Sequence, residues 1–336
     1  MMSSGAPLRI KLFFWAILGV FSVFFAEVVS GSDMYPFFNT VSYLLVIPLY
    51  SLHTLFLWYV VFNFGRGKLY VLFPAGAIFG LYEAYITKVL WNPSWGEAIF
   101  KIGGVAVIET MVLVLFWHAF MSFILPLFLA ETYLTSSREI VNGLPERLRS
   151  WCYTTKNSWK IYLFALCFGF FQATGSTSIE YTLGSGLGCS AVLLFFVFLW
   201  RRWVGQKYSI RDLLPGRLGG IIIGVLLVLY YIILSFLLRL EELPDFSSQA
   251  SIWVLYLFFG VLLYLGLKKS REQEDLMVEW EGYPSIRYMV SLALVFTFGS
   301  VIGVSTGLSV YFALIAWVLG ISFGLWVLNL TVRSVV

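Results

Sequence analysis

The chain alternates long runs of apolar residues with short segments rich in charged and turn-forming residues. Many of these runs reach about 20 residues, the length that an α-helix needs to cross a hydrocarbon core of about 30 Å. We therefore predict an all-α fold, a polytopic transmembrane helix bundle of about ten spans. The predicted spans cover residues 10–30, 36–64, 70–90, 101–134, 159–176, 181–201, 217–239, 250–268, 287–306 and 308–330.

Two predicted spans, 36–64 and 101–134, are longer than one crossing requires, and each contains a proline, Pro48 and Pro126. A proline in a helix interior removes a backbone hydrogen bond and clashes with the preceding turn. We therefore expect tilt or a break in the helix near both prolines.

The first run has a second interpretation, a cleaved signal peptide, because Arg9 and Lys11 precede an apolar stretch that ends in small residues. Cleavage would leave nine spans. The length of the run and the presence of Glu27 favour a retained helix.

The composition agrees with a membrane protein. Hydrophobic residues make up 60% of the chain and charged residues 12%, whereas soluble domains contain about 25% charged residues. The net charge of +4 comes from short basic clusters between the apolar runs, which is typical of topology signals rather than of phosphate-binding surfaces. We therefore expect the lipid bilayer of a cell membrane as partner and no nucleic acid.

The distribution of positive charge predicts the topology. If the amino terminus is cytoplasmic, only Lys88, Lys101 and Arg239 of the 22 lysines and arginines fall on the outer side. Cytoplasmic loops carry the excess of such residues. We therefore predict that both termini are cytoplasmic.

The longest break between apolar runs divides the predicted bundle. It separates a four-helix front half, residues 1–135, from a six-helix back half, residues 160–336. The linker 136–159 mixes basic and aromatic residues and is predicted to be cytoplasmic. It forms either a short interfacial helix on the inner leaflet or a solvated connection.

Four ionisable residues fall within or at the ends of the predicted front-half spans. Counting about 1.5 Å per residue places Glu27, Lys88 and Glu109 toward the outer side and Glu83 nearer the middle of the membrane. Charged groups inside a membrane are costly and often functional, so these residues predict an outward-opening polar cavity that binds a cation or exchanges protons. The alternative is an interfacial salt bridge between Lys88 and the glutamates.

Both histidines of the chain lie in predicted spans. His118 falls near the membrane centre and His53 toward the inner side. On a straight helix with 100° per residue, Glu109 and His118 point to opposite faces and do not share a site. His53, His118 and Glu83 together are candidates for a metal site such as zinc. The alternative is a histidine that is hydrogen-bonded inside the bundle.

Glu83, followed on the next predicted helix by His118 and then Ser122, loosely resembles the intramembrane CAAX-protease and bacteriocin-processing family. The resemblance implies that Glu83 activates water and that His118 is a ligand or an oxyanion donor. The sequence departs from the family pattern at Ala84, where a second glutamate would stand, at Lys88 and at Ser122. It also has no second histidine in the back half.

Gln172 precedes a stretch rich in glycine, serine and threonine, residues 174–190. This composition is typical of an unwound segment that faces a substrate in some transporters. A tight hairpin between closely packed helices explains the same composition and is favoured. Gln172 is a candidate for substrate binding, with a packing role as its alternative.

Three classes of function are compatible with these features. The first is a transporter or channel-like permease for a small solute or ion, which uses the outward-side carboxylates. The second is an intramembrane hydrolase with Glu83 and His118 as catalytic residues, and the third is a noncatalytic assembly or accessory subunit. The sequence identifies neither a cofactor nor a protein partner.

Overall fold

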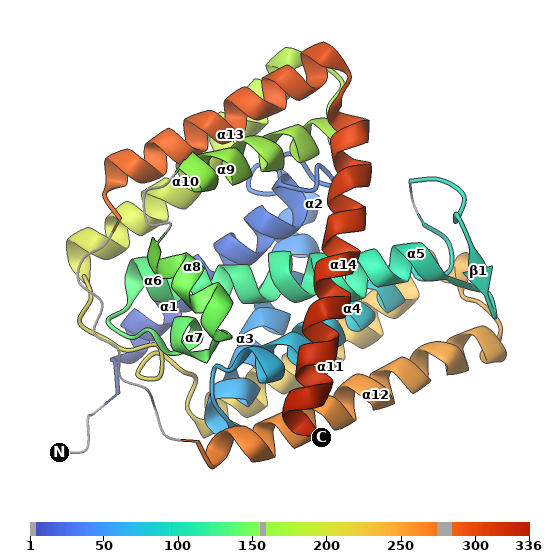
Figure 1. The fold of residues 1–336 in the computed structure, drawn as a ribbon, viewed down its shortest axis with the longest axis horizontal. Coiled ribbons are helices and arrows are strands. Elements are labelled where there is room, and N and C mark those ends of the chain that lie inside the picture. Colours follow the sequence, from blue (N-terminus) through green and yellow to red (C-terminus); the bar gives the residue numbers. More distant parts are fainter. Residues whose placement is uncertain (1–4, 94, 155–158, 274–283) are drawn as a thin grey trace. The chain divides into compact units, whose positions relative to one another are not determined.

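A computed structural model describes residues 5–93, 95–154, 159–273 and 284–336 (Figure 1). The regular elements of the described chain are helical apart from one two-stranded hairpin, β1 Lys101–Ile102 paired antiparallel with β2 Val105–Ala106. The helices are α1 Leu8–Val23, α2 Thr40–Leu44, α3 Val46–Phe64, α4 Leu69–Ile86, α5 Val107–Thr110, α6 Leu125–Leu134, α7 Glu139–Gly143, α8 Glu146–Thr154, α9 Trp159–Gln172, α10 Ile179–Trp203, α11 Arg217–Leu237, α12 Phe246–Arg271, α13 Ile286–Thr306 and α14 Ser309–Val335. Two π-helices, η1 Phe24–Val28 and η2 Met111–Ile124, and two short 3-10 turns, η3 Ala173–Gly175 and η4 Leu240–Glu242, complete the elements.

The all-α transmembrane bundle is confirmed. Nine helical stretches in the described residues are long and apolar enough to cross a membrane. The predicted span 159–176 is not among them, because α9 has 14 residues and extends only about 21 Å.

Contacts between helix ends show which ends share a side. At one side the Lys88 ammonium donates to the carbonyl oxygen of Leu238 at 2.6 Å, which joins the ends of α4 and α11. At the other side the amide of Arg66 donates to Ser270 Oγ at 3.2 Å, which joins the ends of α3 and α12. Between the ends of α4 and α11 lie three long candidate spans. Three crossings would separate these ends, and the further crossing by α9 that the ten-span topology requires stays a prediction.

The described chain divides into two compact units. Unit 1 comprises residues 1–51, 125–214 and 276–318, and unit 2 comprises residues 52–124, 215–275 and 319–336. Each unit is therefore assembled from alternating stretches of chain. The front half, linker and back half remain a prediction about the order of elements along the sequence.

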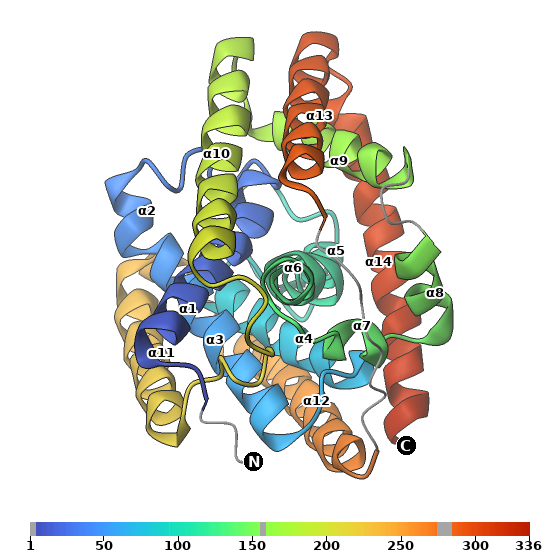
Figure 2. The ribbon, with the colours of Figure 1, turned by 90° about the vertical axis from the view of Figure 1, so that its left-hand side faces the viewer.

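In unit 1, α9, α10 and α13 lie side by side (Figures 1 and 2). Glycines allow α9 and α13 to approach closely: a Cβ atom at Gly169 would overlap the carbonyl oxygen of Phe296, and one at Gly299 would overlap that of Leu166. Small residues at helix contacts are the usual means of packing in lipid.

In unit 2, α4 packs along η2 through Gly76 and Gly80. A Cβ atom at Gly76 would lie 2.7 Å from the Cα of Ala119, and one at Gly80 would lie 3.0 Å from the carbonyl oxygen of Leu113. The pair is a G-x-x-x-G motif, whose glycines lie on one face of a helix and permit close backbone contact. This contact places the face of α4 just before Glu83 against η2.

The two predicted kinks have local causes. The helix stops at Leu44 and restarts at Val46, so Pro48 falls in the first turn of α3, where a missing amide is tolerated. The π-helix η2 ends at Ile124, two residues before Pro126. Pro126 has no amide hydrogen to donate to the carbonyl oxygen of Ser122, four residues earlier. This oxygen instead accepts a hydrogen bond from Thr54 Oγ1 at 3.4 Å.

Two segments differ from the predicted helix boundaries. Residues 101–106, predicted to begin the fourth span, instead form the β1–β2 hairpin, and the helix begins at Val107. The linker 136–159 contains the short helices α7 and α8, and its residues 155–158 lie outside the described part. The Trp151 ring of α8 packs against Phe164 of α9, with 5.8 Å between ring centroids. Whether α8 lies on the inner leaflet remains a prediction.

Candidate functional site

Glu83 and His118 form a direct pair inside unit 2. Glu83 lies near the end of α4 and His118 lies in η2, and their Oε2 and Nε2 atoms are 3.0 Å apart. The side chains are 13% and 3% exposed, respectively. The close contact of α4 with η2 explains the pairing, because Gly80, one turn before Glu83, lies against the Cβ of His118. π-Helical segments are rare and often occur at functional sites.

The hydrogen bonds of His118 determine how many protons the pair holds. Its Nδ1 atom lies 3.2 Å from the carbonyl oxygen of Leu113. A carbonyl oxygen only accepts, so Nδ1 carries a hydrogen in this contact. The Nε2–Oε2 contact then needs one further proton, on either the imidazole or the carboxyl group. If the Nε2–Oε2 contact is a hydrogen bond, the two groups share one proton and have no net charge together.

His53 does not join this pair to form a metal site. Its ring stacks on that of Phe79, with 4.6 Å between the two ring centroids. The centroid of the Phe79 ring in turn lies 5.9 Å from that of the His118 ring. Tyr82 lies 3.9 Å from the His53 ring, edge to face. Across the described ranges, no group of three histidine, cysteine, aspartate or glutamate side chains is suitably placed to hold a metal ion. His53 is therefore part of an aromatic stack next to the pair.

Lys88 binds backbone carbonyls rather than a glutamate. Its ammonium group donates to the carbonyl oxygens of Ile86 at 2.9 Å, Ser235 at 3.1 Å and Leu238 at 2.6 Å. Burial lowers the pKa of the Lys88 ammonium, and the nearby positive charge of Arg239 lowers this pKa further. The predicted salt bridge with the glutamates is not formed within the described part of the chain. Lys88 instead ties the end of α4 to the end of α11.

Glu109 is buried at the start of the following span, in α5. It is 1% exposed, and its Oε1 atom accepts from the backbone amide of Ile99 at 3.0 Å. Its Oε2 atom has no hydrogen-bond partner among the described residues. Buried polar atoms without a partner are costly, so this carboxyl group is a candidate for binding a proton or a cation.

Glu27 lies in unit 1, in the π-helix η1, where Ser32 Oγ donates to its carboxylate. Glu83, Lys88 and Glu109 all belong to unit 2. Glu83 contacts a histidine, and the predicted cavity shared by all four residues remains a prediction.

Gln172 is fully buried between helices of unit 1. Its Nε2 atom donates to Ser185 Oγ at 2.9 Å, and its Oε1 atom accepts from Ser300 Oγ at 2.5 Å. The segment after it turns through η3 and resumes as the regular helix α10, with Ser178 as the amino-terminal cap. The structure thus has a hairpin here rather than an unwound stretch. Both polar ends of Gln172 are used for joining α9, α10 and α13.

A buried polar cluster in unit 1 was not foreseen from the sequence. The Glu131 carboxylate accepts from the amides of Glu139 at 2.6 Å and Ile140 at 2.9 Å, and Arg138 donates to carbonyl oxygens at the end of α6. Arg211 pairs with Glu139 through two nitrogen atoms, at 2.7 and 2.6 Å. The cluster satisfies the ends of α6 and α7 and therefore has a structural role.

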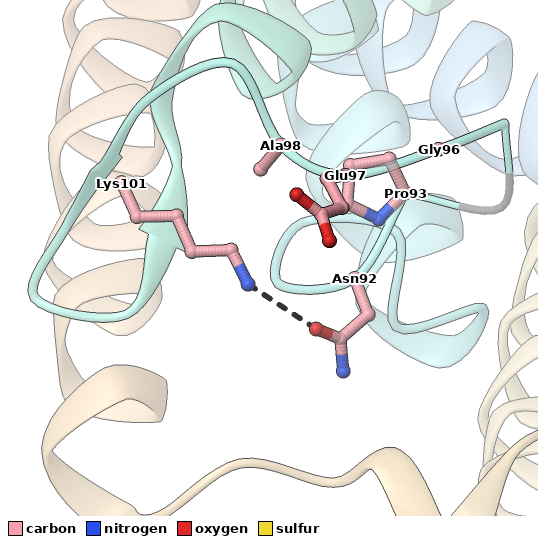
Figure 3. Close-up of a pocket in the computed structure, with 6 residues that line it drawn as sticks. All are labelled: Asn92, Pro93, Gly96, Glu97, Ala98 and Lys101. Atoms are coloured by element: carbon pink, nitrogen blue, oxygen red, sulfur yellow. Dashed lines mark hydrogen bonds between the residues drawn. The ribbon is translucent and has the colours of Figure 1, made fainter.

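A second polar feature of unit 2 is a pocket in the loop after α4, on the side that the charge pattern places outside (Figure 3). It has a volume of about 400 Å³ and is lined by Asn92, Pro93, Gly96, Glu97, Ala98 and Lys101. Lys101 Nζ donates to Asn92 Oδ1 at 3.3 Å. Glu97 was not recognised from the sequence, because a charged loop residue usually has no special role.

Comparisons with known proteins agree with the membrane assignment. The model of a family described as an uncharacterized membrane protein family matches residues 16–336. A protein of Archaeoglobus fulgidus, described as an uncharacterized protein, is 34% identical over 275 residues, which cover 81% of this chain and 83% of the relative. No solved structure matches the chain.

Proposed function

The chain belongs to this uncharacterized membrane protein family of integral, multi-pass proteins, and we propose that it is a permease that couples the passage of a small solute to protons. The observation that supports this function best is the Glu83–His118 pair, with 3.0 Å between Oε2 and Nε2 inside a candidate membrane span.

The charge of this pair depends on its protons. With one shared proton the pair is neutral, which suits an apolar bundle because a net charge inside a membrane is costly. Loss of that proton leaves a negative charge, and gain of another leaves a positive charge. Proton occupancy therefore sets the cost of bringing a charged solute past this point, which is the basis of coupling.

Glu109 supports the same function from the outer end of its span. A buried carboxylate with one unpartnered oxygen is stabilised by a proton or a cation. Because its other oxygen accepts from Ile99, protonation of Glu109 also changes its bond to the outer loop. We assign Glu109 a role in proton entry and Glu83 with His118 the role of the proton-carrying pair.

Proton flux in proteoliposomes tests the proposal. The full chain is reconstituted with a pH-sensitive dye inside the vesicles, and glycine, L-alanine, L-serine and inorganic phosphate, which are charged and cross lipid poorly, are added in turn, with protein-free vesicles as the blank. We expect one of these solutes to cause a pH change inside the vesicles, and we expect Glu83→Gln to abolish it. The matched control is Glu241→Gln, which removes an exposed glutamate of the same unit.

Two results would count against this proposal. One is the absence of solute-dependent flux with every probe, which would favour a noncatalytic assembly role instead. The other is equal flux from wild type and Glu83→Gln, which would remove the Glu83–His118 pair from the coupling mechanism.

A second candidate, an intramembrane hydrolase, is favoured by the same short contact. A carboxylate hydrogen-bonded to a histidine is a common arrangement for a general base and the group that orients it. Cleavage of quenched fluorescent peptides with an apolar membrane-spanning segment tests this function. Cleavage that is lost in both Glu83→Gln and His118→Gln would replace the permease proposal, whereas no cleavage by wild type would eliminate this candidate.

A further inference from the structure

The pocket of the outer loop presents two opposite charges to one space. Figure 3 shows the Glu97 carboxylate and the Lys101 ammonium group directed into the pocket from different sides. Within the described residues, no hydrogen bond or ion pair engages the Glu97 carboxylate, and no ion pair joins it to Lys101. Two unlike charges that face a common space without contacting each other leave room for a ligand between them.

Neighbouring contacts hold the hairpin that carries Lys101 in place. Lys101 begins the β1 strand, and the turn that follows uses Gly103 and Gly104, which have positive φ angles of 55° and 78°. The hairpin is anchored at its base because the Ala106 amide donates to the carbonyl oxygen of Leu90 at 2.8 Å. The backbone that carries Lys101 is therefore preorganised, which reduces the entropy lost on binding.

Asn92 orients the positive side of the pocket. Its side-chain oxygen accepts from Lys101 Nζ at 3.3 Å, and its backbone oxygen accepts from Arg239 at 2.8 Å. Arg239 is itself paired with Glu242, so its charge is already compensated. Lys101 thus remains the cation available to a ligand, and Glu97 the available anion.

The charges and the size together define the class of ligand. A simple anion would meet Lys101 but also face Glu97, and a simple cation would face Lys101. A volume of about 400 Å³ lies at the small end of the usual range for ligand pockets, about 300–1,000 Å³. Pro93, Gly96 and Ala98 add a small, weakly polar wall. We propose that this pocket binds a small neutral α-amino acid, with its ammonium group at Glu97 and its carboxylate at Lys101.

The amino-acid site deepens the proposed function, since it names the class of solute that the permease carries. Only the claim that the bound amino acid is also transported rests on that function. Binding itself does not require transport. A result with binding but no flux would overturn the permease and leave the amino-acid site intact.

The test is calorimetric titration of the purified full chain in detergent. Glycine, L-alanine and L-serine are the probes, and propionate and ethylamine are matched controls that each lack one charged group of alanine. We expect the amino acids to bind and the two analogues to bind at least about fivefold more weakly, as loss of one exposed charge contact would produce.

Substitutions identify the site. Glu97→Gln and Lys101→Met should each weaken alanine binding by about fivefold, whereas Glu241→Gln should leave it unchanged. Thermal unfolding of each variant is measured in parallel, so that loss of folding is not mistaken for loss of binding. Propionate or ethylamine binding as tightly as alanine, no binding of any amino acid up to tens of millimolar, or full affinity in folded Glu97→Gln would each overturn the inference.

Discussion

Replacing Gly76 by alanine tests whether the close contact of α4 with η2 holds Glu83 against His118. A Cβ atom at position 76 would lie 2.7 Å from the Cα of Ala119. Carbon atoms in normal contact are at least about 3.5 Å apart, so the two backbones have to separate by roughly 0.8 Å. Overpacking of this kind costs about 1–3 kcal/mol of unfolding free energy.

The matched control is Gly260→Ala. Gly260 lies in α12 of the same unit, and a Cβ atom there would meet no atom within 4 Å. Both substitutions make the same gain in helix propensity, up to about 1 kcal/mol. The difference between them in thermal unfolding, measured in detergent by circular dichroism, therefore isolates the cost of contact with η2.

The same displacement affects the candidate site. Lengthening the 3.0 Å contact between Glu83 and His118 by roughly 0.8 Å takes it beyond hydrogen-bond range. Misplacement of reacting groups by about 1 Å lowers rates by up to about 100-fold, so proton flux of Gly76→Ala should fall between about 10- and 100-fold. Equal stability and equal flux of Gly76→Ala and Gly260→Ala would refute the reasoning.

Three further substitutions have defined outcomes. Lys88→Met should lower the unfolding free energy by about 1–3 kcal/mol, because buried carbonyl oxygens lose their donor, and thermal unfolding measures this loss. The hydrogen bond from Arg239 holds the pKa of Glu242 below its ordinary value of 4.5. The ionised Glu242 therefore stabilises the fold above pH 4.5, and this stabilisation is lost as the pH falls through the lowered pKa. In a series of melting temperatures against pH, Glu242→Gln should remove this part of the acid dependence. Gln172→Leu should destabilise the chain by about 1–3 kcal/mol, because Ser185 and Ser300 each lose one buried hydrogen bond. The affinity for L-alanine measured by calorimetry should stay unchanged, and a lower affinity in the folded variant would restore Gln172 as a binding residue.

The spans were predictable because a run of about 20 apolar residues has few alternatives to a membrane helix. The start of the fourth span was placed too early, because Ile102, Val105 and Ala106 continue the apolar run of that span. Strands of two residues are also too short to show the alternation of apolar and polar residues that is typical of a strand. The adjacent Gly103 and Gly104 were the available signal of a hairpin turn.

The pairing of Glu83 with His118 could be predicted only in part from the sequence. Counting residues from helix centres gave similar depths, and Gly76 with Gly80 gives a close helix contact, but neither identifies η2 as the partner of α4. The 100° spacing used for Glu109 and His118 does not hold through η2, because a π-helix takes more residues per turn than an α-helix. Contacts between distant segments, such as Lys88 with α11, have no local pattern in the sequence.

The central claim is that Glu83 and His118 share a proton inside the bundle, and ¹⁵N NMR of the imidazole groups measures this most directly. The chain has two histidines, so protein labelled only at histidine gives two sets of ring signals, and His53→Phe assigns them. We predict that Nδ1 of His118 is protonated and that its Nε2 signal shifts when Glu83 is replaced by glutamine. A His118 ring with an unprotonated Nδ1, or with signals that do not change in Glu83→Gln, would contradict the claim.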